Sequence, residues 1–127
     1  MNDEQYREHC RDLVREFAQS IARQTEHLPP EDPLRELAAG FATLGEADAA
    51  LYEEGPALVA RLFTTYPELA PALPRQLLWF FGGDCLHYMP DEEIDRFARL
   101  DELRAEASVR GETLNLRDAR AKLLNLQ

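Results

Sequence analysis

Apolar residues recur at helical spacing through most of the chain, and no segment alternates apolar and polar residues as a half-buried strand would. The first segment shows this pattern clearly, because one stripe repeats at steps of three or four residues: Tyr6, Cys10, Leu13, Phe17 and Ile21. Opposite charges at i,i+3 and i,i+4 occupy its other positions. We therefore predict an amphipathic helix over residues 3–24.

Prolines and glycines divide the middle of the chain into further helices. Asp32 followed by Pro33 is typical of a helix start, with aspartate as the N-cap and proline at the first helical position. We expect Gly-Pro at residues 55–56 to end this helix and to start the next, which continues to Tyr66. Three prolines within residues 67–74 exclude a long helix there but allow one short turn.

Residues 75–89 form the most apolar segment, and their aromatic side chains would also suit a strand. A helix is favoured because apolar residues repeat at steps of three, four and three: Leu78, Phe81, Cys85 and Tyr88. The glycine pair at residues 82–83 leaves a break in this helix open.

Two more helices are predicted towards the C-terminus. Asp91 opens the first, with carboxylates in its first turn, and Gly111 follows it in the position of a C-terminal glycine. Asn115 is the expected N-cap of the second, which runs through Leu124. The pattern therefore predicts an all-α fold: one compact domain over residues 1–127, a bundle of five to six helices without significant sheet.

Composition supports a globular chain. With 127 residues, of which 45% are hydrophobic and 30% charged, the chain is long enough to bury a core without disulfides or a metal. We expect Cys10 and Cys85 to be buried thiols. No charge-free run approaches the roughly 20 apolar residues that a membrane span needs, so we expect no membrane partner. The polar, acidic first residues predict no secretion signal, and we expect a cytoplasmic protein.

Charge narrows the choice of partners. Fourteen basic residues against 24 acidic residues give a net charge of −10, which repels nucleic-acid phosphates. The imbalance is uneven, because no lysine or arginine lies between Arg35 and Arg61 or between Arg75 and Arg96. We therefore expect no nucleic-acid partner, whereas a basic protein partner is compatible with the charge. A weaker hypothesis is a DNA mimic, although acidic residues alternate with arginines in the first and fifth predicted helices.

The common reaction motifs are missing. The six glycines form no dinucleotide-binding turn, and no zinc-protease, Cys-x-x-Cys, nucleophile-elbow or calcium-loop pattern occurs. We therefore expect no cofactor, no metal site and no catalytic residue. Whether the protein is an enzyme stays open, and the pattern favours a protein without catalytic activity.

One group of residues is a candidate pocket or interface. On a helix, Asp84, His87 and Tyr88 would share one face, and they follow Trp79. A carboxylate beside an imidazole is the start of a general acid–base pair, but polar tips that satisfy a packed helix are the more common use of such residues. The three rings of residues 79–81 point in different directions around a helix, so a second subunit is a natural cover for one of them.

The segments LFTTYPELAPALP (residues 62–74) and LLWFFGGDCLHYMPDEEI (residues 77–94) resemble a family of short uncharacterised bacterial proteins. Some members are labelled dehydrogenase, although this chain has no glycine turn for a nicotinamide. The resemblance implies a bacterial cytosolic protein and assigns no activity. The leading hypothesis is a small acidic module for protein interaction or self-association, with a homodimer as one form. The alternative is a small-molecule-binding or minor enzymatic protein with a pocket around Trp79, Asp84, His87 and Tyr88.

Overall fold

Most of the described part of the chain is helical. The computed structural model describes residues 3–46 and 48–111, and none of these residues lies in a strand. The elements are α1 (Asp3–Thr25), α2 (Pro33–Leu44), α3 (Asp48–Thr65), the 3-10 turn η1 (Ala70–Ala72), α4 (Arg75–Phe81), the 3-10 helix η2 (Gly83–Tyr88) and α5 (Asp91–Val109). The predicted all-α fold is confirmed. The last predicted helix, residues 115–124, lies outside the described residues.

The stripe predicted on α1 faces the core. Phe17 on this stripe meets Phe41 of α2 edge to face, with 5.0 Å between ring centroids. The predicted start of α2 is also confirmed, because the Asp32 carboxylate accepts a hydrogen bond of 2.9 Å from the Leu34 backbone N–H. This cap satisfies one of the free donors at the start of the helix.

The boundary between α2 and α3 lies earlier in the chain than predicted. Gly45 caps α2, and α3 then runs through Pro56, so the predicted break at residues 55–56 is wrong. Proline inside a helix removes a backbone hydrogen bond and costs roughly 3 kcal/mol. The helix continues because it buries three side chains completely (Leu51, Val59 and Leu62), and each such burial stabilises the fold by about 1.5–3 kcal/mol.

The predicted helix over residues 75–89 is broken. α4 ends at Phe81, and Gly82 adopts φ +63° and ψ −153°, a conformation that only glycine adopts without strain. The chain continues as η2, so the continuous stripe predicted from Leu78 to Tyr88 does not exist. The alternative of a break at the glycine pair is the correct one.

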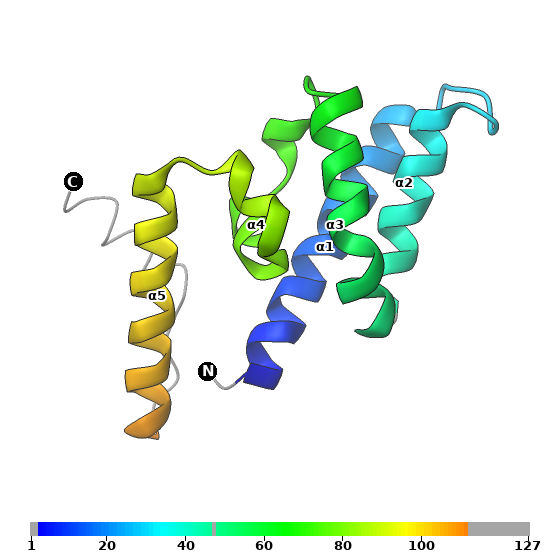
Figure 1. Cartoon of the computed structure of the whole chain (residues 1–127). Coiled ribbons are helices and arrows are strands. Elements are labelled where there is room, and N and C mark those ends of the chain that lie inside the picture. The colour runs from blue at the N-terminus through cyan, green and yellow to red at the C-terminus, as the bar shows by residue number, and fades with distance from the viewer. Residues whose placement is uncertain (1–2, 47, 112–127) are drawn as a thin grey trace.

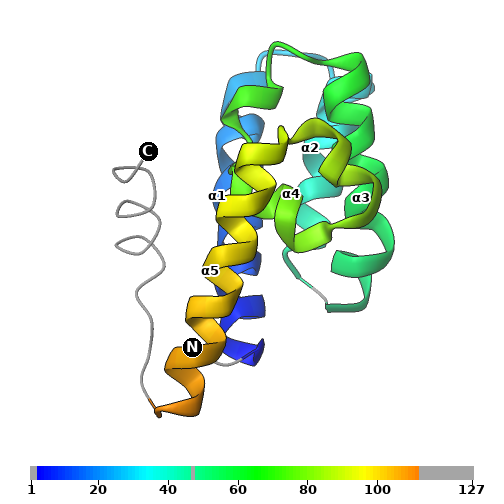
Figure 2. The ribbon, with the colours of Figure 1, turned by 60° about the vertical axis from the view of Figure 1, so that its left-hand side comes forward.

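α5 packs against α4 and reaches the first turn of α1. In Figure 1, α4 stands between the upper part of α5 and the group formed by α1, α2 and α3, and Figure 2 turns the molecule so that α5 comes to the front. An ion pair of 2.9 Å joins Arg104 of α5 to Asp3 at the start of α1. The start of α5 at Asp91 agrees with the prediction, as does Gly111, which follows the helix with φ +72°. Within the described residues, no helix is both long and apolar enough to cross a lipid bilayer.

Candidate functional site

The predicted pair of Asp84 and His87 is close but lies in open solvent. The Asp84 Oδ1 and His87 Nε2 atoms are 3.9 Å apart on η2, and the two side chains are 102% and 80% exposed, respectively. Apolar neighbours therefore do not shield the pair from water. Water screens the interaction of two such exposed groups.

Trp79 and Tyr88 contact two different elements. The Trp79 indole N–H donates a hydrogen bond of 3.0 Å to Asp101 of α5, and its ring stacks on Phe97 at 6.2 Å. The Tyr88 ring stacks on Phe63 of α3, with 4.3 Å between centroids and 22° between planes. The structure thus brings Asp84 and His87 together. Trp79 instead connects α4 to α5, and Tyr88 connects η2 to α3.

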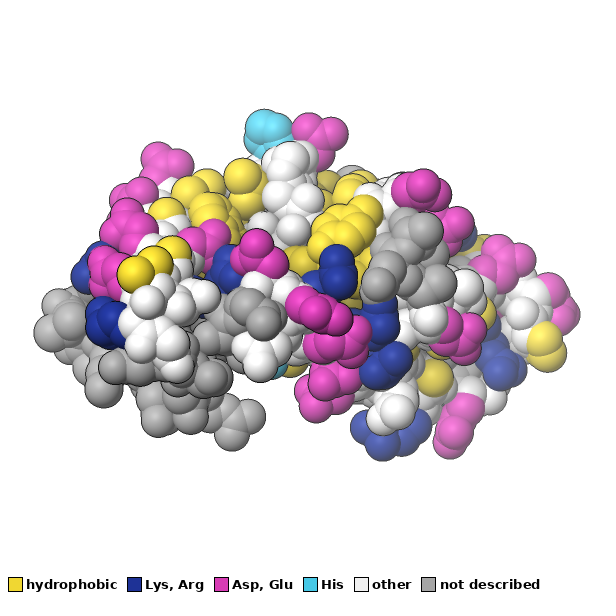
Figure 3. Space-filling model, turned by 90° about the horizontal axis from the view of Figure 1, so that it is seen from below, with side chains coloured by type: hydrophobic (Ala, Val, Ile, Leu, Met, Phe, Trp, Pro, Cys, Tyr) yellow, Lys and Arg dark blue, Asp and Glu magenta, His cyan; other side chains and the backbone are white. Residues whose placement is uncertain are grey.

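A row of three rings lies where α3 meets α4, and the Phe63–Tyr88 stack lies where α3 meets η2. Phe80 contacts both Tyr52 of α3 and its neighbour Phe81, with ring centroids 5.4 Å apart in each case. We call this row, together with the Phe63–Tyr88 stack, the aromatic seam: Tyr52, Phe63, Phe80, Phe81 and Tyr88. Four of these residues are half-buried, and Tyr52 is 51% exposed. The view from below shows hydrophobic side chains exposed near the middle of that face, with charged side chains around them (Figure 3).

Because Gly55 has no side chain, the Phe81 ring of the seam can pack directly against α3. A Cβ atom at this position would lie 2.4 Å from the Phe81 Cε1 atom, far inside van der Waals contact. The absence of a side chain therefore allows the Phe81 ring to lie directly on the backbone of α3. Sequence reasoning missed this role and treated the glycine as part of a helix stop. The available signal was the spacing of Tyr52, Gly55, Val59 and Phe63 along one face of a helix.

A buried polar group supports the seam from below. The side-chain amide of Gln76 donates a hydrogen bond to the Tyr6 hydroxyl, and the Tyr6 ring meets Phe80 edge to face at 6.0 Å. Burial raises the pKa of the Tyr6 hydroxyl well above its ordinary value and raises the pKa of the Cys10 thiol to about 12. Both groups are neutral at physiological pH, so neither supplies an activated base or nucleophile.

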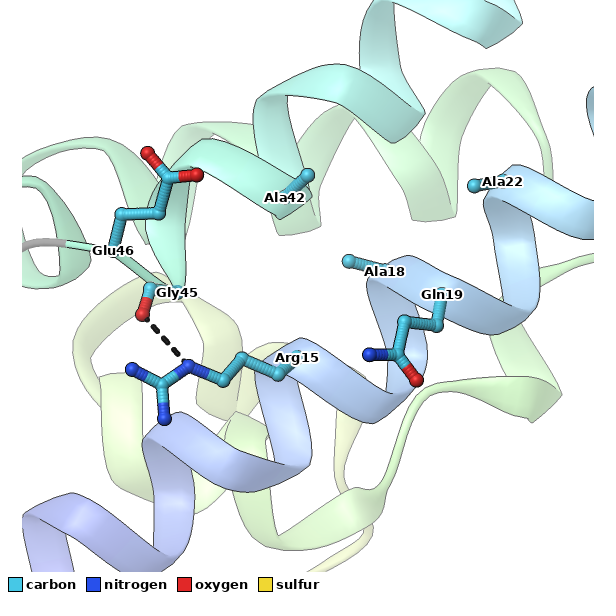
Figure 4. A pocket seen from close by; sticks show the side chains of 7 residues that line it. All are labelled: Arg15, Ala18, Gln19, Ala22, Ala42, Gly45 and Glu46. Atoms are coloured by element: carbon cyan, nitrogen blue, oxygen red, sulfur yellow. Dashed lines mark hydrogen bonds between the residues drawn. The ribbon is translucent and has the colours of Figure 1, made fainter.

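A shallow groove of about 270 Å³ lies between α1 and the end of α2. Figure 4 shows alanines from both helices along it and Arg15 reaching from α1 to the end of α2, where its Nε–H donates a hydrogen bond of 3.0 Å to the Gly45 carbonyl. This arginine satisfies a free carbonyl at the helix end. Arg15, the charged side chain that crosses the groove, thus has a structural role at the end of α2.

Metal ligands do not gather in the part of the chain that the structure describes. Within residues 3–46 and 48–111, no group of three or more histidine, cysteine, aspartate or glutamate side chains is arranged to hold a metal ion. Cys10 and Cys85 are both buried and free, as predicted. Burial raises the pKa of the Cys85 thiol, and the nearby Asp84 adds to the effect.

Comparison with known proteins gives one match. A family model described as PA2817-like matches residues 4–127. Neither the curated proteins nor the solved structures contain a match to this chain.

Proposed function

The chain belongs to the PA2817-like family, and we propose that it is a cytoplasmic protein-interaction module without catalytic activity that binds its partner through the aromatic seam. Self-association, with a homodimer as its simplest form, is included in this proposal.

The observation that carries the proposal is the exposure of Tyr52. Its ring is 51% exposed yet rests on Phe80, which continues into the half-buried rings of α4. Tyrosine and phenylalanine are enriched in the buried centres of protein interfaces, where large rigid rings provide contact area at a low entropic cost. A partner that covers Tyr52 would therefore gain a preformed aromatic surface.

The titratable groups support a role in binding rather than catalysis. Tyr6 and Cys10 are buried and neutral, while Asp84 and His87 are exposed to bulk water. A general acid–base pair is most effective where its pKa values are tuned by burial and where water is excluded. The alternative of a small-molecule pocket around Trp79, Asp84, His87 and Tyr88 has the proximity of Asp84 and His87 as its one supporting contact.

Photocrosslinking in the source cells tests this proposal. A photoreactive p-benzoylphenylalanine replaces Tyr52 in one variant and Val109 in a matched control, since these are the two exposed large hydrophobic residues of the described chain. We expect one defined adduct from position 52 and none from position 109, and an adduct with the mass of two chains would identify self-association. Equal labelling at both positions, or none at either, would contradict an interaction through the seam.

A further inference from the structure

We propose that the partner of the aromatic seam is a basic amphipathic helix, with lysine or arginine beside a row of apolar side chains. This inference rests on the proposed function and adds the chemistry of the partner. Two observations support it: the charge of the elements that form the seam and the pairing of the nearby arginines.

The two base-poor stretches of the sequence meet at the seam. No lysine or arginine occurs in residues 36–60 or 76–95. The first of these stretches supplies Tyr52 and Gly55, and the second supplies residues 76–81 of α4 and all of η2. Both α4 and η2 contact α3. Segments far apart in the sequence thus meet at the seam and contribute carboxylates, but no lysine or arginine, to its surface.

Acidic side chains border the rings. Glu53 is exposed next to Tyr52, and Asp84 is fully exposed on η2. Asp91 and Glu92 are exposed at the start of α5, directly after η2. Carboxylates around an apolar centre match the charge of a partner that carries basic residues beside its apolar face.

The arginines of neighbouring elements do not cancel this charge. Arg75 is in an ion pair of 2.8 Å with Glu93. Arg11 and Arg15 of α1 pair with acidic residues of their own helix at 2.9 and 3.1 Å. Arg61 lies two residues beyond Val59, which turns it roughly 200° around α3 from the seam face.

The same charges disfavour a second copy of this chain as the occupant. Two chains of net charge −10 that met seam to seam would place their carboxylate borders together, and like charges across an interface are costly.

A synthetic peptide pair tests the inference on the full-length protein. One peptide has about 18 residues, which is long enough to form a helix when bound. It carries leucine at positions i, i+3, i+4 and i+7 and lysine at the other positions. The second peptide has glutamate in place of every lysine. Isothermal titration calorimetry measures the affinity. We expect binding of the lysine peptide, at least about 100-fold weaker binding of the glutamate peptide, and a loss of affinity for the lysine peptide with rising salt.

Variants separate the seam from general attraction to an acidic protein. Tyr52→Ala should weaken binding of the lysine peptide about tenfold, and the double variant Glu53→Gln/Asp84→Asn should weaken it several-fold. The matched controls Val109→Ala and Glu26→Gln/Glu31→Gln change residues of the same kind elsewhere and should leave the affinity unchanged. All the charge changes are at exposed positions, so loss of folding does not explain a loss of binding.

Three outcomes would overturn the inference. These are equal losses in the seam variants and their controls, equal affinity for both peptides, and no binding of the lysine peptide. If Tyr52→Ala instead converts a dimer into a monomer in sedimentation experiments without any peptide, a second copy is the occupant. If a second copy is the occupant, or if crosslinking at position 52 succeeds although the lysine peptide does not bind, the proposed interaction through the seam is retained and the proposal of a basic partner is wrong.

Discussion

Phe81 lies where a Cβ atom on Gly55 would be, and this single contact sets how closely α4 approaches α3. Such contacts are difficult to predict from sequence, because a glycine next to a proline is usually read as a turn. The same limit applies to Tyr52, because the residues around it do not indicate that the distant Phe80 ring packs against it. The sequence pattern singled out Trp79 and Tyr88 as candidates for a pocket or interface, but it could not supply their contacts, Asp101 and Phe63.

Two glycine substitutions should have different effects. In Gly55→Ala the new methyl group would collide with the Phe81 ring at 2.4 Å, whereas in Gly40→Ala it would lie 3.1 Å from the end of the Leu58 side chain. Alanine favours a helix by about 1 kcal/mol over glycine. We expect Gly40→Ala to be neutral or stabilising and Gly55→Ala to lose about 1–3 kcal/mol to overpacking. Urea unfolding measures both, and equal stabilities would show that the Phe81 contact is not tight.

The Cys10 thiol should make stability depend on alkaline pH. Burial raises its pKa from 9.0 to about 12, so the folded protein retains a proton that the unfolded chain releases above pH 9. This stability is complete below pH 9 and is lost as pH rises towards 12. Between pH 8 and 10 the wild type should lose about 1 kcal/mol more than Cys10→Ala. Urea unfolding at the two pH values provides the measurement, and parallel losses would place the thiol in contact with water.

At the scale of elements, the sequence predicted the helix starts at Asp32 and Asp91 correctly but missed the boundary between α2 and α3. Asp32 and Asp91 mark true starts because capping residues and carboxylates act on the adjacent turn, a purely local effect. The ends depend on distant packing. α3 continues through Pro56 because its buried residues outweigh the lost hydrogen bond, and α4 stops at Gly82 although its apolar pattern continues.

The two glycines after α4 should differ in their tolerance of alanine. Gly82, with φ +63° and ψ −153°, is in a region essentially reserved for glycine, while Gly83 has φ +52° and open space for a Cβ atom. We expect Gly82→Ala to cost about 2–3 kcal/mol and Gly83→Ala about 1 kcal/mol. Thermal melts followed by circular dichroism would compare them. A larger loss for Gly83→Ala would mean that the break in the chain does not depend on the conformation of Gly82.

At the scale of the whole molecule, polar contacts join α5 to the rest. Glu93 pairs with Arg75 of α4, Asp101 accepts from Trp79, and Arg104 pairs with Asp3 of α1. Phe97, Leu100 and Ala107 add three buried side chains. An element held by a few contacts of this kind opens more readily than the core of a bundle.

Removal of one of these contacts should loosen α5 selectively. Arg75 binds both the Glu93 carboxylate and the Tyr88 carbonyl, and Arg75→Ala should cost about 2 kcal/mol. Native-state hydrogen exchange in α5 should then be roughly 30-fold faster, with a smaller change in α1. Arg99→Ala is the control, because Arg99 pairs with Glu102 and Glu106 within α5 itself. Equal acceleration in both helices would indicate that α5 opens only together with the bundle.

The hydrogen bond between Tyr6 and Gln76 has a consequence for how the molecule forms. It joins residues 70 positions apart, whereas α1 with α2 and α2 with α3 are sequence neighbours. Short loops close at a lower entropic cost, and distant contacts slow folding. During refolding, most of the helical signal in far-ultraviolet circular dichroism should therefore return before α4 docks against α1 and α3. Newly refolded chains would pass through a stage that is largely helical but not yet able to bind.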